Sequence, residues 1–225
     1  MNRYSRNETM LTHQENKSLR KKKILVAGCG GLGGYIAEML ARLGVGHLTL
    51  VDGDVFEESN LNRQLFSDSR RIGQSKAEAG RERLNLVNPD VTVTIFYETL
   101  NKENARDICA GHHVLMDGLD SAGSRRILQE AGEILSIPMV HGAIAGWYGQ
   151  VTTIFPGDRA LEKIYPPDAE RGIEQDMGNP SFTPALVASV QAAEALKILI
   201  GRGTLLRGRL LYMDCLSHEY NTFEI

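Results

Sequence analysis

A glycine-rich turn between an apolar run and a helix-forming run constrains the fold of this chain most strongly. Residues 24–28 read Ile-Leu-Val-Ala-Gly, an apolar run typical of a strand buried on both faces of a parallel sheet. Residues 28–33 read Gly-Cys-Gly-Gly-Leu-Gly and fit the pattern G-x-G-x-x-G. An amphipathic run follows over 34–43, and a second apolar strand over 47–52 ends in Asp52. Together these runs predict a βαβ unit.

The rest of the chain continues the alternation of strands and helices. Its patterns predict further strands over 91–96, 114–117, 138–143, 150–155, 209–213 and 219–224, and helices over 74–87, 122–135 and 184–200. Strands that alternate with helices favour an α/β fold, here a Rossmann-like, mostly parallel sheet flanked by helices. The alternating pattern from residue 150 onward predicts an antiparallel C-terminal extension of that sheet.

The length of 225 residues fits one domain. We expect a single unit over 1–225, with a nucleotide-binding βαβ part over about 20–145. A crossover loop follows over about 156–184, and a C-terminal helix and strands complete the unit over about 184–225. The loop is rich in proline, glycine and charge, and long loops of this kind in compact domains are often functional.

Composition excludes several classes of protein. A net charge of −3 disfavours a nucleic-acid-binding domain. The three cysteines, Cys29, Cys109 and Cys215, form no C-x-x-C pair, so we expect neither structural zinc nor a disulfide framework. The polar segment 1–23 lacks the apolar centre of a signal peptide, and no apolar run approaches the length that spans a bilayer. A cytoplasmic protein without a membrane partner is expected.

The glycine loop predicts a nucleotide site. Glycines allow the backbone to approach a phosphate closely, and the start of the following helix offers N–H groups and partial positive charge. Asp52, at the end of the next strand, can accept hydrogen bonds from a ribose. A simpler alternative is that Asp52 only caps a loop. On these features alone, NAD is the default ligand.

Charged residues downstream favour a triphosphate over a nicotinamide. Arg63 ends the run Ser59-Asn-Leu-Asn-Arg63, and Lys76 follows at the start of a predicted helix. Asp117 and Asp120 end another predicted strand, where carboxylates can hold Mg²⁺ together with phosphates. Each residue has a simpler alternative role, namely a surface ion pair for Arg63, a solvated helix residue for Lys76 and a helix N-cap for Asp120.

In this order and spacing the motifs resemble the ThiF/MoeB/HesA family, the bacterial relatives of ubiquitin-activating enzymes. The glycine loop, Asp52-Gly-Asp54, the run 59–64, Lys76 and the two strand-end acids carry the resemblance. Arg3-Tyr-Ser-Arg6 is similar to the family's N-terminal R-Y-x-R. With the runs at His141, Gly149 and Ser189, which are similar to later elements of the family, the resemblance covers almost the whole chain.

The resemblance implies an adenylyltransferase that uses ATP and Mg²⁺. In this family the C-terminal glycine carboxylate of a small ubiquitin-like carrier attacks the α-phosphorus of ATP, and pyrophosphate leaves. The implied partner is a carrier that ends in Gly-Gly, in a pathway of the thiamine or molybdopterin type, and the implied assembly is a homodimer. Three alternatives remain: activation of another carboxylate on a modified tRNA base or a peptide, an NAD(P)-binding oxidoreductase, and a non-enzymatic ATP-sensing protein.

The resemblance also assigns residues. Catalytic roles fall to Arg63, Lys76, Asp120 and Arg6, with Asp120 binding or orienting Mg²⁺ and Arg6 reaching into the neighbouring subunit's site. The residues that the resemblance implies for nucleotide binding are Gly28, Gly30, Gly31, Gly33, Asp52, Asp54, Ser59, Asn60, Arg63, Lys76, Asp120 and Ser121.

The chain departs from the family in three respects. It lacks the paired C-x-x-C motifs that bind zinc in many members, so no zinc is expected. No cysteine lies between Cys109 and Cys215, so a covalent intermediate on the crossover loop is not expected and sulfur would come from a separate donor. Ser121 stands where the family commonly has asparagine, which leaves the contacts to adenine or ribose open there. His141 is interpreted as a hydrogen-bonded structural histidine.

Overall fold

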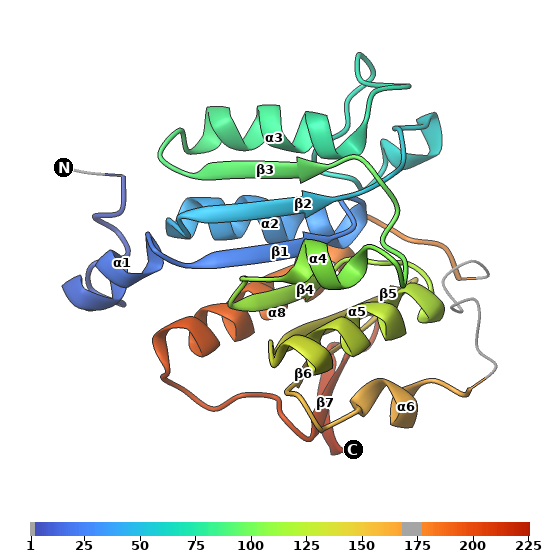
Figure 1. The fold of residues 1–225 in the computed structure, drawn as a ribbon. Coiled ribbons are helices and arrows are strands. Elements are labelled where there is room, and N and C mark those ends of the chain that lie inside the picture. The colour runs from blue at the N-terminus through green and yellow to red at the C-terminus, as the bar shows by residue number, and fades with distance from the viewer. Residues whose placement is uncertain (1–2, 168–176) are drawn as a thin grey trace.

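The computed structural model describes residues 3–167 and 177–225, which form one sheet with helices on both faces (Figure 1). Its strands are β1 Lys23–Ala27, β2 His47–Val51, β3 Thr92–Phe96, β4 Val114–Asp117, β5 Met139–Ala145, β6 Tyr148–Ile154, β7 Arg209–Asp214 and β8 Glu219–Glu224. They lie in the order β3-β2-β1-β4-β5-β6-β7-β8. The pairs from β3 to β5 are parallel, and the pairs from β5 to β8 are antiparallel. The predicted fold class is confirmed.

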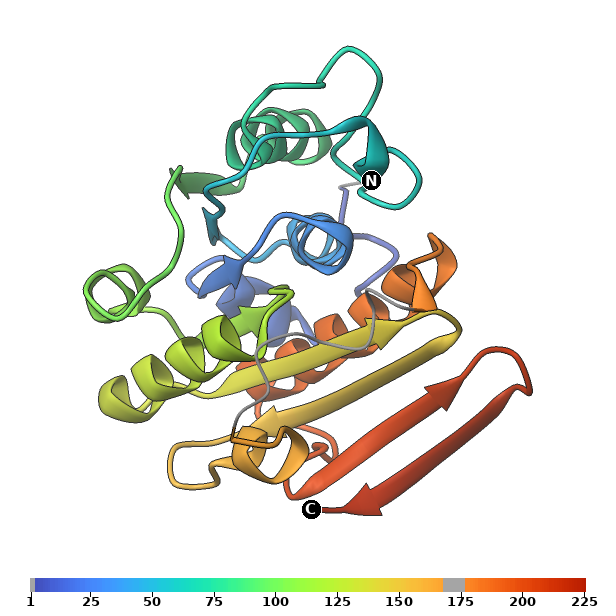
Figure 2. The same ribbon diagram turned by 90° about the vertical axis from the view of Figure 1, so that its right-hand side faces the viewer.

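Helices cover both faces of the sheet (Figure 2). Those described are α1 His13–Leu19, α2 Gly31–Leu43, α3 Lys76–Val87, α4 Ala105–Cys109, α5 Ala122–Leu135, α6 Ala160–Ile164 and α8 Phe182–Ile200. Side chains of α2, α3 and α8 form one apolar cluster with the sheet, and side chains of α4, α5 and α6 form the other. The sheet therefore separates two cores.

Strand β1 shows why a continuous apolar run suits this position. Its residues Ile24 and Val26 belong to the core beneath α2 and α8, whereas Leu25 and Ala27 belong to the core beneath α5. All four are completely buried. Because successive side chains of a strand point to opposite faces, a strand covered on both sides needs apolar residues at every position.

The helix boundaries differ from the predicted ones where the glycine loop itself becomes helical. Helix α2 begins at Gly31, with Gly30 as its N-cap, so the last glycines of the motif form its first turn. The predicted helix began only at residue 34, because glycine is a poor helix former in isolation. Three short helices, α1, α4 and α6, were not predicted. Their five to seven residues are too few to show a helical period.

The structure also differs from the sequence-based expectations in the crossover segment and in the late helix α8. Helix α6 lies inside the segment predicted to be a loop over 156–184, and residues 168–176 of that segment lie outside the described residues. Among the described helices, α8 alone has the length and apolar composition to cross a membrane, which the sequence analysis did not expect of any run. Half of that stretch is buried here, where α8 packs against α2, β5 and β6.

The strand order places a crevice at one edge of the sheet. The chain continues from β1 to β2 on one side and later adds β4 on the other side of β1. The connection after β1 therefore runs to one side of β1, and the connection into β4 runs to its other side. Such a reversal opens a crevice outside the carboxyl ends of the two strands, which is where ligands bind in such sheets. In Figure 1 the carboxyl ends of β2 and β3 lie at the right of the view.

Two glycines of the loop are predicted to respond differently to an added methyl group. A Cβ on Gly33 would lie 1.7 Å from the carbonyl oxygen of Gly28, whereas a Cβ on Gly31 would lie 3.6 Å from its nearest neighbour, Pro184. We expect Gly33→Ala to lower the free energy of unfolding by about 3 kcal/mol or more. Gly31→Ala should change it by less than about 1 kcal/mol. Urea unfolding of both variants tests this, and equal losses would show that the helix does not depend on this contact.

Candidate functional site

A pocket of about 280 Å³ opens at the carboxyl ends of β1, β2 and β4. It lies at the crevice that the strand order creates, with the N-terminus of α2 facing it. Backbone N–H groups and the positive end of a helix dipole favour negatively charged groups at such a place. The predicted site residues that line it are Gly28, Gly30, Gly31, Asp52, Asp54, Arg63, Lys76 and Asp120.

Other predicted site residues lie outside the pocket lining. Gly33 packs beneath the loop against Gly28, as the close approach described above shows. Asn60 accepts the Glu57 N–H at Oδ1 (3.1 Å) and so caps the short 3₁₀ helix Glu58–Asn60. The Ser121 hydroxyl accepts the Ser124 N–H (3.1 Å) and caps α5.

Ser59 and Arg6 also lie outside the lining. The Ser59 carbonyl accepts a hydrogen bond from Arg63 Nη1 (2.9 Å), so Ser59 contributes to the position of that arginine. Arg6 is exposed in the N-terminal segment, which packs near the far end of α2.

Asp52 joins the glycine loop to the end of β2. Its Oδ2 accepts the Cys29 N–H at 2.6 Å, and its Oδ1 accepts the Asp54 N–H at 2.8 Å. Asp52 therefore caps a loop and lines the pocket at once. Burial raises its pKa above the ordinary value of 3.8, although both backbone N–H groups oppose that shift. An ionised carboxylate can accept about four hydrogen bonds, so capacity remains for a ribose hydroxyl.

Two cationic side chains reach the pocket from the segment after β2. Lys76 is the first residue of α3, and its side chain is 10% exposed. Its Nζ lies 3.0 Å from Oδ2 of Asp54, whose side chain is 68% exposed. The half-buried Arg63 donates from Nη1 to the Ser59 carbonyl and to Asn62 Oδ1, both at 2.9 Å. An ammonium ion paired with an exposed carboxylate can exchange that partner for a phosphate.

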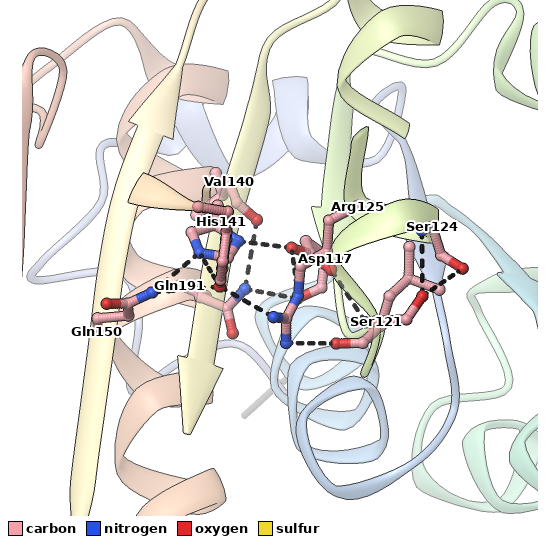
Figure 3. Close-up of polar contacts among 10 residues, drawn as sticks. Asp117, Ser121, Ser124, Arg125, Val140, His141, Gln150 and Gln191 are labelled. Carbon is pink, nitrogen blue, oxygen red and sulfur yellow. Dashed lines mark hydrogen bonds and ion pairs between the residues drawn. The ribbon is translucent and has the colours of Figure 1, made fainter. Parts of the chain in front are cut away.

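The two strand-end acids have different surroundings, and Figure 3 shows those of Asp117. Asp117 is completely buried, accepts a hydrogen bond from His141 Nδ1 (2.6 Å) and lies 3.6 Å from Arg125 Nε. It is therefore committed to the protein interior. Asp120 is exposed and lines the pocket, so of the two acids it is the one able to bind a metal beside a nucleotide.

A metal that binds here would need ligands from the nucleotide. In the described part of the chain, no three His, Cys, Asp or Glu side chains are grouped to hold a metal ion. Mg²⁺ commonly uses only one or two carboxylates together with substrate phosphates and water. The exposed carboxylate of Asp120 suits Mg²⁺ of that kind, bound only with a nucleotide.

His141 has the structural role that the sequence predicts. It is completely buried, and burial lowers its pKa below 6.5 while the Asp117 carboxylate opposes the shift. Gln191 of α8 donates to the Asp117 carbonyl (2.8 Å) and the Val140 carbonyl (3.3 Å), which ties α8 to β4 and β5 beside the histidine.

Several lining residues were missed by the sequence analysis. Gln64 is 6% exposed, and its Oε1 has no hydrogen-bond partner among the described residues. Arg125 comes from α5, and Asn179 comes from the C-terminal part of the crossover segment, where its carbonyl accepts from Asn62 Nδ2 (2.9 Å). Gln64 is the last residue of the motif run 59–64, whereas Arg125 and Asn179 lie in no motif and carried no sequence signal that could place them.

Comparison with known proteins identifies relatives of the whole chain. A family model described as the ThiF family matches residues 4–225. The chain is 35% identical over 227 residues to the SAMP-activating enzyme E1 of Haloferax volcanii, covering 99% of this chain and 84% of that protein. It is 33% identical over 216 residues to the sulfur carrier protein adenylyltransferase of Thermus thermophilus, covering 92% of this chain and 80% of that protein. The predicted family resemblance is confirmed.

Longer relatives and solved structures add to this. The chain spans about half the length of relatives named adenylyltransferase and sulfurtransferase. The crystal structure of E. coli tRNA N6-threonylcarbamoyladenosine dehydratase in complex with ATP matches with a TM-score of 0.76 and 24% identity, covering 88% of this chain and 94% of that one. At this identity the match supports the fold alone.

The buried His141 generates a prediction for stability against pH. Its folded pKa is lowered, so the unfolded chain binds a proton below about pH 6.5 that the folded chain does not bind. The free energy of unfolding should therefore fall as the pH falls from 7.5 to 5. In His141→Gln this slope should be shallower by up to about 1.4 kcal/mol per pH unit. Urea unfolding at several pH values measures it, and an unchanged slope in the variant would contradict this account.

Proposed function

The chain belongs to the ThiF family and is an adenylyltransferase, and we propose that it activates the C-terminal glycine carboxylate of a ubiquitin-like carrier protein. The observation that carries this proposal is the pocket itself. It combines the N-terminus of α2, two cationic side chains and an exposed carboxylate at the end of the Asp117–Asp120 segment. A nicotinamide cofactor would leave Arg63 and Lys76 without an evident use, whereas a triphosphate uses both.

The proposed reaction depends on positioning and on neutralising charge. A carboxylate oxygen attacks the α-phosphorus of ATP, and the bond to the bridging oxygen breaks so that pyrophosphate leaves with its electron pair. Arg63 and Lys76 would stabilise the charge that develops on the pyrophosphate. Asp52 would hold the ribose, and the backbone at Gly30 would approach the phosphates. When bound with the nucleotide at Asp120, Mg²⁺ supplies further neutralisation of the phosphates.

A carrier protein with a C-terminal Gly-Gly is the proposed substrate because two relatives are named for SAMP activation and for a sulfur carrier. The pathway, of the thiamine or molybdopterin type, stays part of the proposal. So do a single adenylation domain over 1–225, a cytoplasmic location and a separate sulfur donor. The crossover segment would cover the carrier tail, although residues 168–176 of it lie outside the described residues.

A homodimer is proposed from the position of Arg6. Tyr4 packs against Gly44, the C-cap of α2, where a Cβ would lie 2.6 Å from the tyrosine ring. Helix α2 has 13 residues, so its ends lie about 20 Å apart, and the pocket is at the other end beside Gly30. Arg6 therefore lies far from the pocket of its own subunit. A role for Arg6 in catalysis requires the pocket of a second copy.

The first test of the function is ATP–pyrophosphate exchange with candidate carriers that end in Gly-Gly. Exchange should require the intact carrier C-terminus. Arg63→Ala and Lys76→Ala should each lower kcat by about 100-fold or more because each removes a charge that stabilises the leaving pyrophosphate. Thermal unfolding should show that both variants remain folded.

A matched control is available on the same segment of the chain. Arg70→Ala removes an arginine whose partner is Asp68 and which lies outside the pocket lining, so its exchange activity should equal that of the wild type. Exchange supported by a peptide or by a modified tRNA base in place of the carrier would favour activation of that carboxylate. Full activity of both Arg63→Ala and Lys76→Ala would refute their roles.

The second test addresses the homodimer. We expect Arg6→Ala and Lys76→Ala homodimers to be inactive alone, and to regain activity when subunits are mixed and allowed to exchange. After random exchange, half of the dimers contain one subunit of each variant. In such a dimer one of the two sites has both Lys76 and Arg6, so about one quarter of wild-type activity should return. If Arg6 served its own subunit, every mixed site would lack one residue and no activity would return. Exchange activity measured before and after mixing distinguishes the two results.

A further inference from the structure

The residue before Asp120, Leu119, is held by two hydrogen bonds, one at its N–H group and one at its carbonyl group. The Leu119 N–H donates to Asp117 Oδ1 at 2.9 Å, and the Leu119 carbonyl accepts from Arg125 Nη2 at 2.8 Å. Both sides of Leu119 are thus fastened to charged side chains that are buried. The next residue is Asp120, which lines the pocket, so the placement of its backbone depends on this arrangement.

Arg125 is in turn held by Tyr165, which lies just after α6. Its Nη1 donates to the Tyr165 hydroxyl oxygen at 2.9 Å, and its guanidinium carbon lies 5.5 Å from the centre of the tyrosine ring. The arginine side chain is 5% exposed. A buried guanidinium depends strongly on its hydrogen bonds because a charge that loses its partner away from water is costly.

Tyr165 is fixed to the sheet by the residues beside the buried histidine. Its hydroxyl accepts from Gln150 Nε2 (3.2 Å) and lies 3.3 Å from His141 Nε2, and its ring meets the imidazole edge-on with centres 5.7 Å apart. Figure 3 shows His141 and Gln150 on neighbouring strands facing Arg125 and Asp117. The Tyr165 side chain, at the end of α6, therefore contacts both the sheet and an arginine that lines the pocket.

The backbone at this point is fastened as well. Arg126, the residue after Arg125, donates from Nη2 to the carbonyls of Tyr165 and Pro166. Two consecutive residues of α5 thus hold the same short segment, one by its side chain and the other by its backbone. The position of this segment and the position of the Leu119 carbonyl are coupled through α5.

We propose that Tyr165 is a positioning residue that holds, through Arg125 and the Leu119 carbonyl, the backbone from which the Asp120 side chain enters the pocket. This inference rests on the proposed function, in which Asp120 acts with Mg²⁺. Loss of the Tyr165 hydroxyl removes one hydrogen bond from Arg125 and weakens its hold on the Leu119 carbonyl, while the ion pair with Asp117 remains.

The test compares the wild type with Tyr165→Phe, which keeps the ring and removes the hydroxyl. In the free protein, amide hydrogen exchange at Leu119 should be about fivefold faster in the variant. Calorimetry should show Mg·ATP binding weakened by about fivefold, while binding of ATP in EDTA changes by less than about twofold. The Mg²⁺ concentration for half-maximal pyrophosphate exchange should rise by a similar factor.

Tyr212→Phe is the matched control, because Tyr212 stacks on Tyr148 at a ring distance of 6.0 Å and lies outside the pocket lining. It should match the wild type in all three measurements. Unchanged amide exchange and unchanged Mg·ATP binding in Tyr165→Phe would overturn the proposal, and so would an equal loss of ATP binding with and without Mg²⁺. A wild-type protein that binds no ATP would instead refute the proposed function, while the amide exchange at Leu119 would still report on the coupling.

Discussion

The contact between three glycines determines how the nucleotide pocket is built. Gly28 follows β1, Gly33 lies in the first turn of α2, and Gly118 follows β4. A Cβ on Gly118 would lie 3.0 Å from the Gly33 Cα and 3.0 Å from the Gly28 carbonyl oxygen. Backbones that approach this closely leave no volume for side chains, so the start of α2 is held against the ends of two neighbouring strands. The helix N-terminus therefore faces the crevice between β1 and β4.

Two groups of charged side chains around this frame are paired in the protein itself. Lys76 pairs with the exposed Asp54, whereas Asp117 is enclosed with His141 and Arg125. The first pair can be exchanged for a phosphate at little cost because its carboxylate remains solvated. The second group cannot, since separating buried charges is expensive. Solvent exposure thus divides residues that can meet a ligand from residues that support the site.

Short motifs predicted the part of the site that is local in sequence. The glycine loop, Asp52 and Lys76 lie at ends of strands or helices, and parallel strands bring their carboxyl ends to one edge. Asn60 and Ser121 belong to the same motifs, yet their side chains cap the turns in which they lie. A motif identifies a segment, whereas backbone N–H groups compete with the ligand for each polar side chain within it. That competition is settled only by local geometry.

The sequence by itself determined the order of the strands and of the longer helices, the glycine loop and the family. These follow from patterns that neighbouring residues carry, because burial on both faces and close backbone approach restrict residue type at each position. Only the tertiary structure decided that Arg125, Tyr165 and Asn179 meet the pocket region, and that Arg6 lies at the far end of α2. Such meetings join residues from distant segments, and their energy depends on distance and exposure, which no local pattern encodes.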